Sequence, residues 1–139
     1  MFQKILVPVD LTETHGRSLE IAAELTGAGR GEVTLLHVIE LIAGMEVEEE
    51  KEFYGRLEQA ADEHMRRLGQ VLEGKKGTWA ARVRYGERAQ EIVRHALENG
   101  TDLIVLTSHK VDPGRPGSGW GTLSYKVGIL SPCPVLLVK

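Results

Sequence analysis

The chain lacks the cysteines of a disulfide framework, the excess of positive charge of a nucleic-acid-binding protein and the long apolar run of a membrane span. Its 139 residues include one cysteine, Cys133, so no internal disulfide can form and no metal site can be built on several cysteines. A lone cysteine also fits a reducing compartment, and we expect a cytoplasmic protein. With 17 Lys and Arg against 20 Asp and Glu, the formal net charge is −3, which leaves no cationic excess for a phosphate backbone. We therefore expect no nucleic-acid partner.

Long hydrophobic runs are also missing. The first apolar run, Ile5–Val7, is too short for the core of a signal peptide or for a membrane span, so we expect neither export nor a membrane partner. What is present is ordinary for a folded globular chain, with 42% hydrophobic and 27% charged residues. A length of 139 residues suits one core. We assign residues 1–139 to a single domain.

Short apolar runs alternate with segments of helical period, which predicts an α/β protein with a mostly parallel sheet. The first and fourth runs are nearly continuous Val, Ile and Leu, as in central strands that are covered on both faces. The third run alternates apolar and basic residues, which favours a position at the edge of the sheet. The five predicted strands are Lys4–Val9, Val33–Ile39, Thr78–Tyr85, Asp102–Leu106 and Pro134–Val138.

Four helices are predicted between these strands. The first begins after Asp10, with Thr12 or Thr14 as its N-cap, and ends near the glycines at positions 27 and 29. The second is preceded by an acidic run at 46–50, which we read as its solvated start. The later helices follow stripes of apolar residues at three- and four-residue steps: Phe53–Leu72, Ala89–Leu97 and about Thr122–Leu130.

Two loops are candidates for ligand binding. Ligands of open parallel sheets lie beyond the carboxyl ends of the strands, where the strand order reverses. The first strand leads into Pro8-Val9-Asp10. The fourth leads into Thr107-Ser108-His109-Lys110 and then a segment with glycines at 114, 117, 119 and 121. A glycine-rich segment that opens into a helix offers backbone N–H groups and the helix dipole to an anion. Alternatively, the same segment is a flexible surface loop made of turn residues, and the pattern favours neither interpretation over the other.

Five segments, in order along nearly the whole chain, carry a resemblance to a known family. They are Ile5-Leu6-Val7-Pro8-Val9-Asp10, Leu36-His37-Val38, Gly86 to Ile92, Asp102 to Val105, and Pro132 to Val138. Together they resemble the universal stress protein family. The resemblance implies a Rossmann-like, doubly wound five-stranded parallel sheet of order 3-2-1-4-5, with helices on both faces.

The resemblance also implies a site. In nucleotide-binding members, the aspartate of the first loop and the residue after the second-strand histidine hold the adenosine, and here these are Asp10 and Val38. The phosphates of such members lie on a G-x-x-G segment that is followed nine residues on by G-[ST]. Here Thr107 and Lys110 stand where the two leading glycines belong, and ten residues separate Lys110 from Gly121. Lys110 either supplies charge in place of backbone contacts or fills the space of a phosphate.

We therefore expect a module that binds an adenine nucleotide, ATP or AMP, with Mg if the ligand is ATP, and that acts in stress response or signalling. No residue is assigned to catalysis or to a metal site. The alternative is a dimeric interaction protein of the same family that binds no nucleotide. The expected nucleotide-binding residues are Pro8, Val9, Asp10, Val38, Thr107, Ser108, His109, Lys110, Gly119, Gly121, Thr122, Leu123 and Ser124.

Plainer roles compete with these assignments. An aspartate such as Asp10 at a helix start is more often a cap. His37 lies within a strand and is read as a core histidine. The remaining helical histidines, at positions 15, 64 and 95, have no carboxylate or cysteine at ligand spacing and are read as structural or surface residues. Motifs of serine hydrolases, P-loop ATPases and zinc proteases are missing, so we expect no enzyme, with slow hydrolysis of bound ATP left open.

The last strand points to assembly. In the implied order, Pro134–Val138 lies at a sheet edge and carries no charge, so it is a template for pairing with another chain. A second copy of the same strand across a two-fold axis closes such an edge. We expect a homodimer through this strand.

Overall fold

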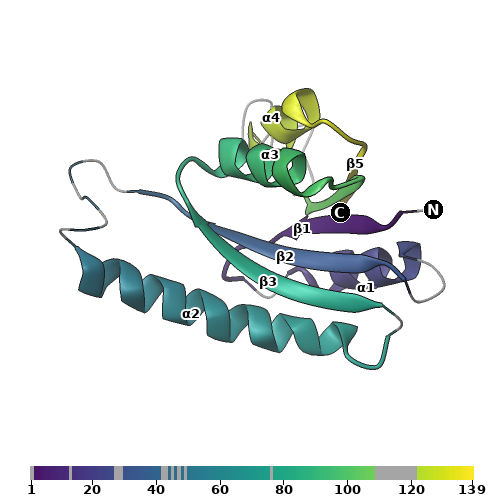
Figure 1. Cartoon of the computed structure of the whole chain (residues 1–139), viewed down its shortest axis with the longest axis horizontal. Coiled ribbons are helices and arrows are strands. Elements are labelled where there is room, and N and C mark those ends of the chain that lie inside the picture. Colours follow the sequence, from purple (N-terminus) through teal and green to yellow (C-terminus); the bar gives the residue numbers. More distant parts are fainter. Residues whose placement is uncertain are drawn as a thin grey trace, which may run out of the picture.

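The computed structural model describes residues 2–12, 14–26, 30–41, 44, 46, 48, 50–75, 77–108 and 122–139. Five strands form one parallel sheet in the order β3-β2-β1-β4-β5 (Figure 1). This confirms the α/β fold and the sheet order, with β1 and β4 inside the sheet and β3 at an edge. The strands are β1 (Lys4–Pro8), β2 (Glu32–Ile39), β3 (Thr78–Tyr85), β4 (Leu103–Thr107) and β5 (Val135–Val138).

Helices cover both faces of the sheet, as in doubly wound Rossmann-like folds (Figure 1). On one face lie α1 (Gly16–Leu25) and α2 (Lys51–Gly69), which continues as the 3₁₀ turn η1 (Gln70–Leu72). On the other face lie α3 (Arg88–Asn99) and α4 (Thr122–Leu130). None of the helices in the described ranges is both long enough and apolar enough to cross a membrane.

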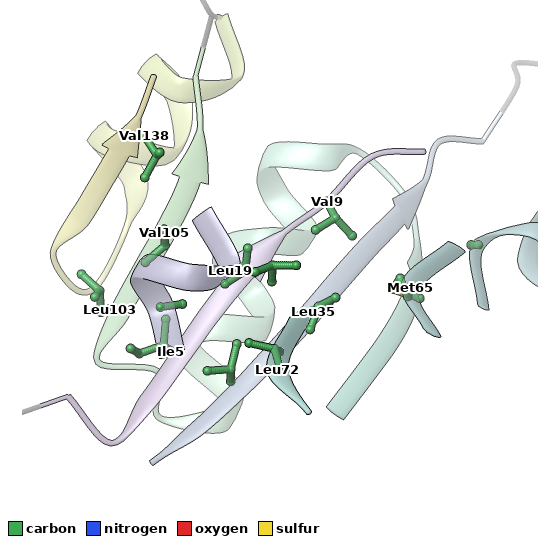
Figure 2. Packing of buried hydrophobic residues seen from close by; sticks show 13 residues of the cluster. Ile5, Val9, Leu19, Leu35, Met65, Leu72, Leu103, Val105 and Val138 are labelled. Atoms are coloured by element: carbon green, nitrogen blue, oxygen red, sulfur yellow. The ribbon is translucent and has the colours of Figure 1, made fainter. Parts of the chain in front are cut away.

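The alternation of side chains along β1 divides the core into two layers. Ile5 and Val7 join a cluster with Leu19 of α1 and Met65 of α2, whereas Leu6 joins the cluster beneath α3 and α4. Figure 2 shows the first cluster, whose side chains gather along β1, β2 and β4. Full burial of an aliphatic side chain contributes about 1.5–3 kcal/mol. Because β1 is packed on both of its faces, the position of its carboxyl end is fixed.

The first helix begins later than the sequence pattern predicts. Its first residue is Gly16 and its N-cap is His15, so the prediction of Thr12 or Thr14 as N-cap is wrong. The N–H and the hydroxyl of Thr12 both donate to Oδ1 of Asp10, at 2.9 and 2.6 Å, and these bonds close a turn before the helix. The helix consequently begins six residues after Asp10.

Several further boundaries differ from the predicted ones by a few residues. Glu50, the last residue of the acidic run, is the N-cap of α2, and the helix begins at Lys51. Asp102, the first residue of the predicted fourth strand, lies just before β4. Its carboxylate accepts the backbone N–H groups of Gln3 and Lys4. The stop of α3 is confirmed, since Gly100 has a φ of 65°, the left-handed conformation that suits glycine after a helix.

Candidate functional site

The carboxyl ends of β1 and β4 form the switch point of the sheet. The two strands lie side by side, with Ile5 opposite Leu103 and Leu6 opposite Ile104. The chain continues from β1 to α1 on one face of the sheet and from β4 to α4 on the other face (Figure 1). Ligand crevices of open α/β sheets lie at such reversals. The candidate site is therefore at the end of these two strands.

Asp10 is held in one orientation at this point. Its Oδ1 accepts three hydrogen bonds: from the N–H of Thr12 at 2.9 Å, from the hydroxyl of Thr12 at 2.6 Å and from Nε2 of His15 at 2.8 Å. Its Oδ2 has no hydrogen-bond partner among the residues that the structure describes, and about half of the side chain, 49%, is exposed to solvent. One carboxylate oxygen is thus saturated, while the other has no partner among the described residues and can accept hydrogen bonds.

The environment keeps Asp10 ionised. Burial alone would raise the pKa of this carboxyl, but the hydrogen bonds from Thr12 and His15 stabilise the charged form more strongly, and the net effect is a pKa well below the ordinary range. An ionised carboxylate only accepts hydrogen bonds. Oδ2 therefore suits a ligand that presents hydroxyl or amino hydrogens.

His15 connects Asp10 to the neighbouring strand end. Its Nδ1 lies 3.0 Å from Oγ1 of Thr107, the last residue of β4, and that oxygen lies 2.6 Å from Oγ of Ser18 in the first turn of α1. His15 is 5% exposed and Ser18 is fully buried. The sequence pattern predicts a structural or surface role for His15 and does not single out Ser18, so this network is not evident from the sequence alone.

The backbone of β2 offers a second polar edge. The N–H of Val9 donates to the carbonyl oxygen of Leu36 at 2.8 Å, so the backbone of Leu36 is directed toward β1. Because direction alternates along a strand, the N–H and C=O of Val38 are directed the same way. β1 ends at Pro8, opposite Leu36, so Val38 lies beyond the paired part of the strand. A donor and an acceptor on one backbone edge match the amidine-like edge of a purine base.

Pro8 and Val9 contribute by placing Asp10. Both are buried, and the side chain of Val9 belongs to the core cluster beneath α1 and α2. His37 is satisfied in the core, because its Nδ1 donates to the carbonyl oxygen of Val9 at 2.9 Å. His64 of α2 donates from Nε2 to the carbonyl oxygen of Thr12 at 2.8 Å. Two histidines thus support the backbone on either side of Asp10.

The residues that begin α4 face the end of β4. Oγ of Ser124 lies 3.4 Å from Oγ of Ser108, and the Nζ of Lys139 lies 3.4 Å from the same hydroxyl. The N–H of Ser108 donates to the carbonyl oxygen of Val138. Leu123 packs against the cluster beneath α3 and α4, and Thr122 is the first residue of α4. Four of the predicted site residues, His109, Lys110, Gly119 and Gly121, lie outside the described residues.

Two other features of the described part of the chain lie apart from this site. No group of three or more His, Cys, Asp or Glu residues there could hold a metal ion. A polar pocket of about 70 Å³ lies at the opposite end of the sheet, where strands begin, and contains none of the predicted site residues. Its lining includes Lys4, Glu32, Thr34, Arg82, His95 and Asn99.

Comparison with known proteins gives a match along the whole chain. A sequence model of the universal stress protein family matches residues 1–139. The universal stress protein YxiE of Bacillus subtilis is 31% identical over 149 residues, which cover 100% of both chains. The solved structure of hypothetical protein MJ0577 has a TM-score of 0.82 and 31% identity, covering 100% of this chain and 96% of that one.

More distant structures share the fold. A universal stress protein solved with cAMP has a TM-score of 0.70 at 18% identity, covering 99% of this chain and 97% of that one. One from Archaeoglobus fulgidus solved with dAMP has a TM-score of 0.60 at 23% identity, covering 99% and 98%. One from Arabidopsis thaliana with AMP bound has a TM-score of 0.62 at 19% identity, covering 99% and 91%.

Proposed function

The chain belongs to the universal stress protein family, and from this premise we propose that it binds an adenine nucleotide, ATP or AMP, at the switch point between β1 and β4. We propose that residues 1–139 act as one domain of that family. In this proposal the protein is a binding module of stress response or signalling that works in the cytoplasm.

The geometry of Asp10 carries this proposal. Three hydrogen bonds to Oδ1 hold the carboxylate, while Oδ2 accepts none from the described residues and the side chain is half exposed. Ribose hydroxyls are donors that such an ionised acceptor binds strongly. The backbone of Val38, directed toward the β1 side beyond the end of that strand, would pair with the adenine edge. Asp10 and Val38 together therefore support recognition of the adenosine part.

The phosphates would lie toward α4. The helix begins at Thr122, and backbone N–H groups at a helix start bind anions. The hydroxyls of Ser108 and Ser124 lie between the end of β4 and this helix. We assign His109, Lys110, Gly119 and Gly121 to the same phosphate-binding segment, and Mg²⁺ would accompany ATP. Structures that share the fold were solved with cAMP, dAMP and AMP, which supports an adenine nucleotide as the ligand class.

We assign no catalytic activity to this site. Thr107, His15 and Asp10 have the residue types of a nucleophile, a base and a carboxylate. However, Oγ1 of Thr107 is bonded to the fully buried Ser18, so the hydroxyl faces α1. A hydroxyl engaged by Ser18 and His15 is not directed at a phosphate that would lie at the start of α4. The arrangement supports binding rather than group transfer.

A homodimer through the last strand is part of the proposal. β5 is at the edge of the sheet, paired with β4, and its Leu136 and Leu137 are 38% and 42% exposed. The neighbouring helix α4 also exposes Tyr125 and Ile129. An apolar edge of this kind is normally covered, and a second copy of the same strand would cover it. The dimer is also the basis of the second candidate function, an interaction protein that binds no nucleotide.

Thermal melting with nucleotides tests the proposed function. MgATP at a hundred times its dissociation constant should stabilise the protein by about 2.7 kcal/mol, and AMP should act in the same direction. The variant Val38→Pro removes one backbone donor, while Trp79→Phe changes a partly buried side chain that packs against the core and serves as the control. If ATP, ADP and AMP all leave the melting temperature unchanged at millimolar concentration, the second candidate function replaces the first.

A further inference from the structure

A chain of three hydrogen bonds crosses the switch point. It runs from Oγ of Ser18 to Oγ1 of Thr107 at 2.6 Å, from that oxygen to Nδ1 of His15 at 3.0 Å, and from Nε2 of His15 to Oδ1 of Asp10 at 2.8 Å. Ser18 belongs to α1, Thr107 ends β4, and Asp10 follows β1. These three hydrogen bonds therefore connect the two loops of the proposed site.

The direction of the first two bonds follows from counting hydrogens. Ser18 is fully buried, and Oγ1 of Thr107 is the partner of its hydroxyl within the described part of the chain. A buried hydroxyl must place its hydrogen on an acceptor, so Ser18 donates to Thr107. The hydrogen of Thr107 is then directed to its other partner, Nδ1 of His15, which must be unprotonated to accept it.

The other ring nitrogen must carry the proton. The carboxylate of Asp10 only accepts hydrogen bonds, so a separation of 2.8 Å between Nε2 and Oδ1 requires a hydrogen on Nε2. The N–H of Asp10 lies 3.2 Å from the same nitrogen, but this longer contact would need Nε2 to be bare beside a carboxylate oxygen. Both ends of the ring thus agree on one neutral tautomer.

We propose that His15, as the neutral tautomer protonated on Nε2, is a positioning residue for the nucleoside part of the ligand. It fixes Oδ1 of Asp10, so that Oδ2 is presented to ribose hydroxyls. Thr107 fixes His15 in turn. The inference rests on the proposed function. It gives Thr107 a role at the adenosine end of the ligand, although this residue begins the segment assigned to the phosphates.

The two roles for Thr107 predict different ligand profiles. If its hydroxyl acts through His15 on Asp10, its loss weakens adenosine and ATP by the same factor, because both carry the ribose. If it instead contacts a phosphate, its loss weakens ATP and leaves adenosine unchanged. Thr107→Val removes the hydroxyl and keeps the shape of the side chain, and Thr107→Ser restores the hydroxyl.

Calorimetric titration of adenosine and of MgATP against these variants is the binding test. His15→Ala and Thr107→Val should each weaken both ligands about three- to tenfold, by equal factors within error, since the net contribution of one ordinary hydrogen bond changes affinity on that scale. Thr107→Ser should bind like the wild type. His95→Gln, a histidine buried at the other end of the sheet, is the matched control and should change nothing. Loss confined to MgATP would overturn the positioning role.

The nitrogen spectrum of the histidines tests the tautomer in the wild-type protein without ligand. In long-range ¹H–¹⁵N correlation spectra near neutral pH, His15 should show a protonated Nε2 and a bare Nδ1, and Thr107→Val should shift the Nδ1 signal. A proton on Nδ1 would overturn the inference, whatever the binding data. A correct tautomer in a protein that binds no adenine ligand would overturn the proposed function and the ligand role, while the hydrogen-bond chain itself would stand.

Discussion

Lys4 and Asp102 are bonded to each other in both directions. The N–H of Asp102 donates to the carbonyl oxygen of Lys4 at 2.9 Å, and the N–H of Lys4 donates to Oδ1 of Asp102 at 3.0 Å. The second carboxylate oxygen accepts the N–H of Gln3 at 2.8 Å. One side chain before β4 therefore fixes the start of β1, and with it the register of the two strands that carry the candidate site.

Removing this carboxylate should destabilise the protein. Asp102→Ala leaves the amides of Gln3 and Lys4 without their acceptor, and we expect the free energy of unfolding to fall by about 1–2 kcal/mol. Urea denaturation measures the change. Glu63→Ala, on the exposed side of α2, serves as a control and should lie close to the wild type. Equal midpoints for both variants would mean that solvent replaces the two bonds at no cost.

Asp10 should link stability to acid pH. Its pKa is lowered in the folded state by Thr12 and His15, against the opposing effect of burial, so the unfolded chain takes up the proton more readily. The stabilisation is present above the unfolded value of about 4 and is lost as the pH falls below it. The difference in unfolding free energy between the wild type and Asp10→Asn should therefore shrink between about pH 6 and about pH 3. A constant difference over this range would contradict the linkage.

His95 should link stability to mildly acid pH. Burial, and then the positive charge of Arg84, lowers its pKa in the folded state, so the neutral form is favoured there. The contribution is complete above the unfolded value of about 6.5 and is lost as the pH falls through it. Chemical denaturation at about pH 8 and about pH 5 should show a larger loss for the wild type than for His95→Gln. Parallel losses would show that other groups cause the acid sensitivity.

The edge of β5 can be tested by a charge. Leu136→Arg places a cation on the exposed part of the strand and should convert a dimer to monomer or cause aggregation, whereas Val138 is buried in the fold and is unsuitable for this test. Light scattering at micromolar concentration should give twice the chain mass of 15.3 kDa for the wild type. Leu97→Arg, at a 64% exposed position on α3, is the matched control. A wild-type mass of one chain would exclude the dimer.

Much of the fold could be predicted because it depends on local composition. The continuous apolar runs around Leu6 and Ile104 identified the central strands, and the alternation along Thr78–Tyr85 identified the edge. The start of α1 was missed because a side chain outside the helix, Asp10, binds the backbone of Thr12 and closes a turn first. Capping propensity alone does not register that competition.

The candidate site was predicted less fully, for a physical reason. Asp10 and Thr107 were found because they follow strands that meet at the switch point. His15 was not, because its partner Thr107 lies 92 residues away, and no local pattern pairs a histidine with a distant hydroxyl. The available signal was its position: five residues after Asp10, a side chain at the start of α1 can reach back to the end of the sheet.

The position of β1 in the sheet also matters while the chain is being made. β1 is an inner strand, yet one of its two neighbours, β4, follows it by almost a hundred residues. At translation rates of about 5–20 residues per second, this side of β1 has no partner for roughly 5–20 seconds. A nascent chain therefore carries an apolar strand with one open side on the ribosome. Chaperones that bind emerging apolar segments have that interval in which to act before Asp102 reaches Lys4.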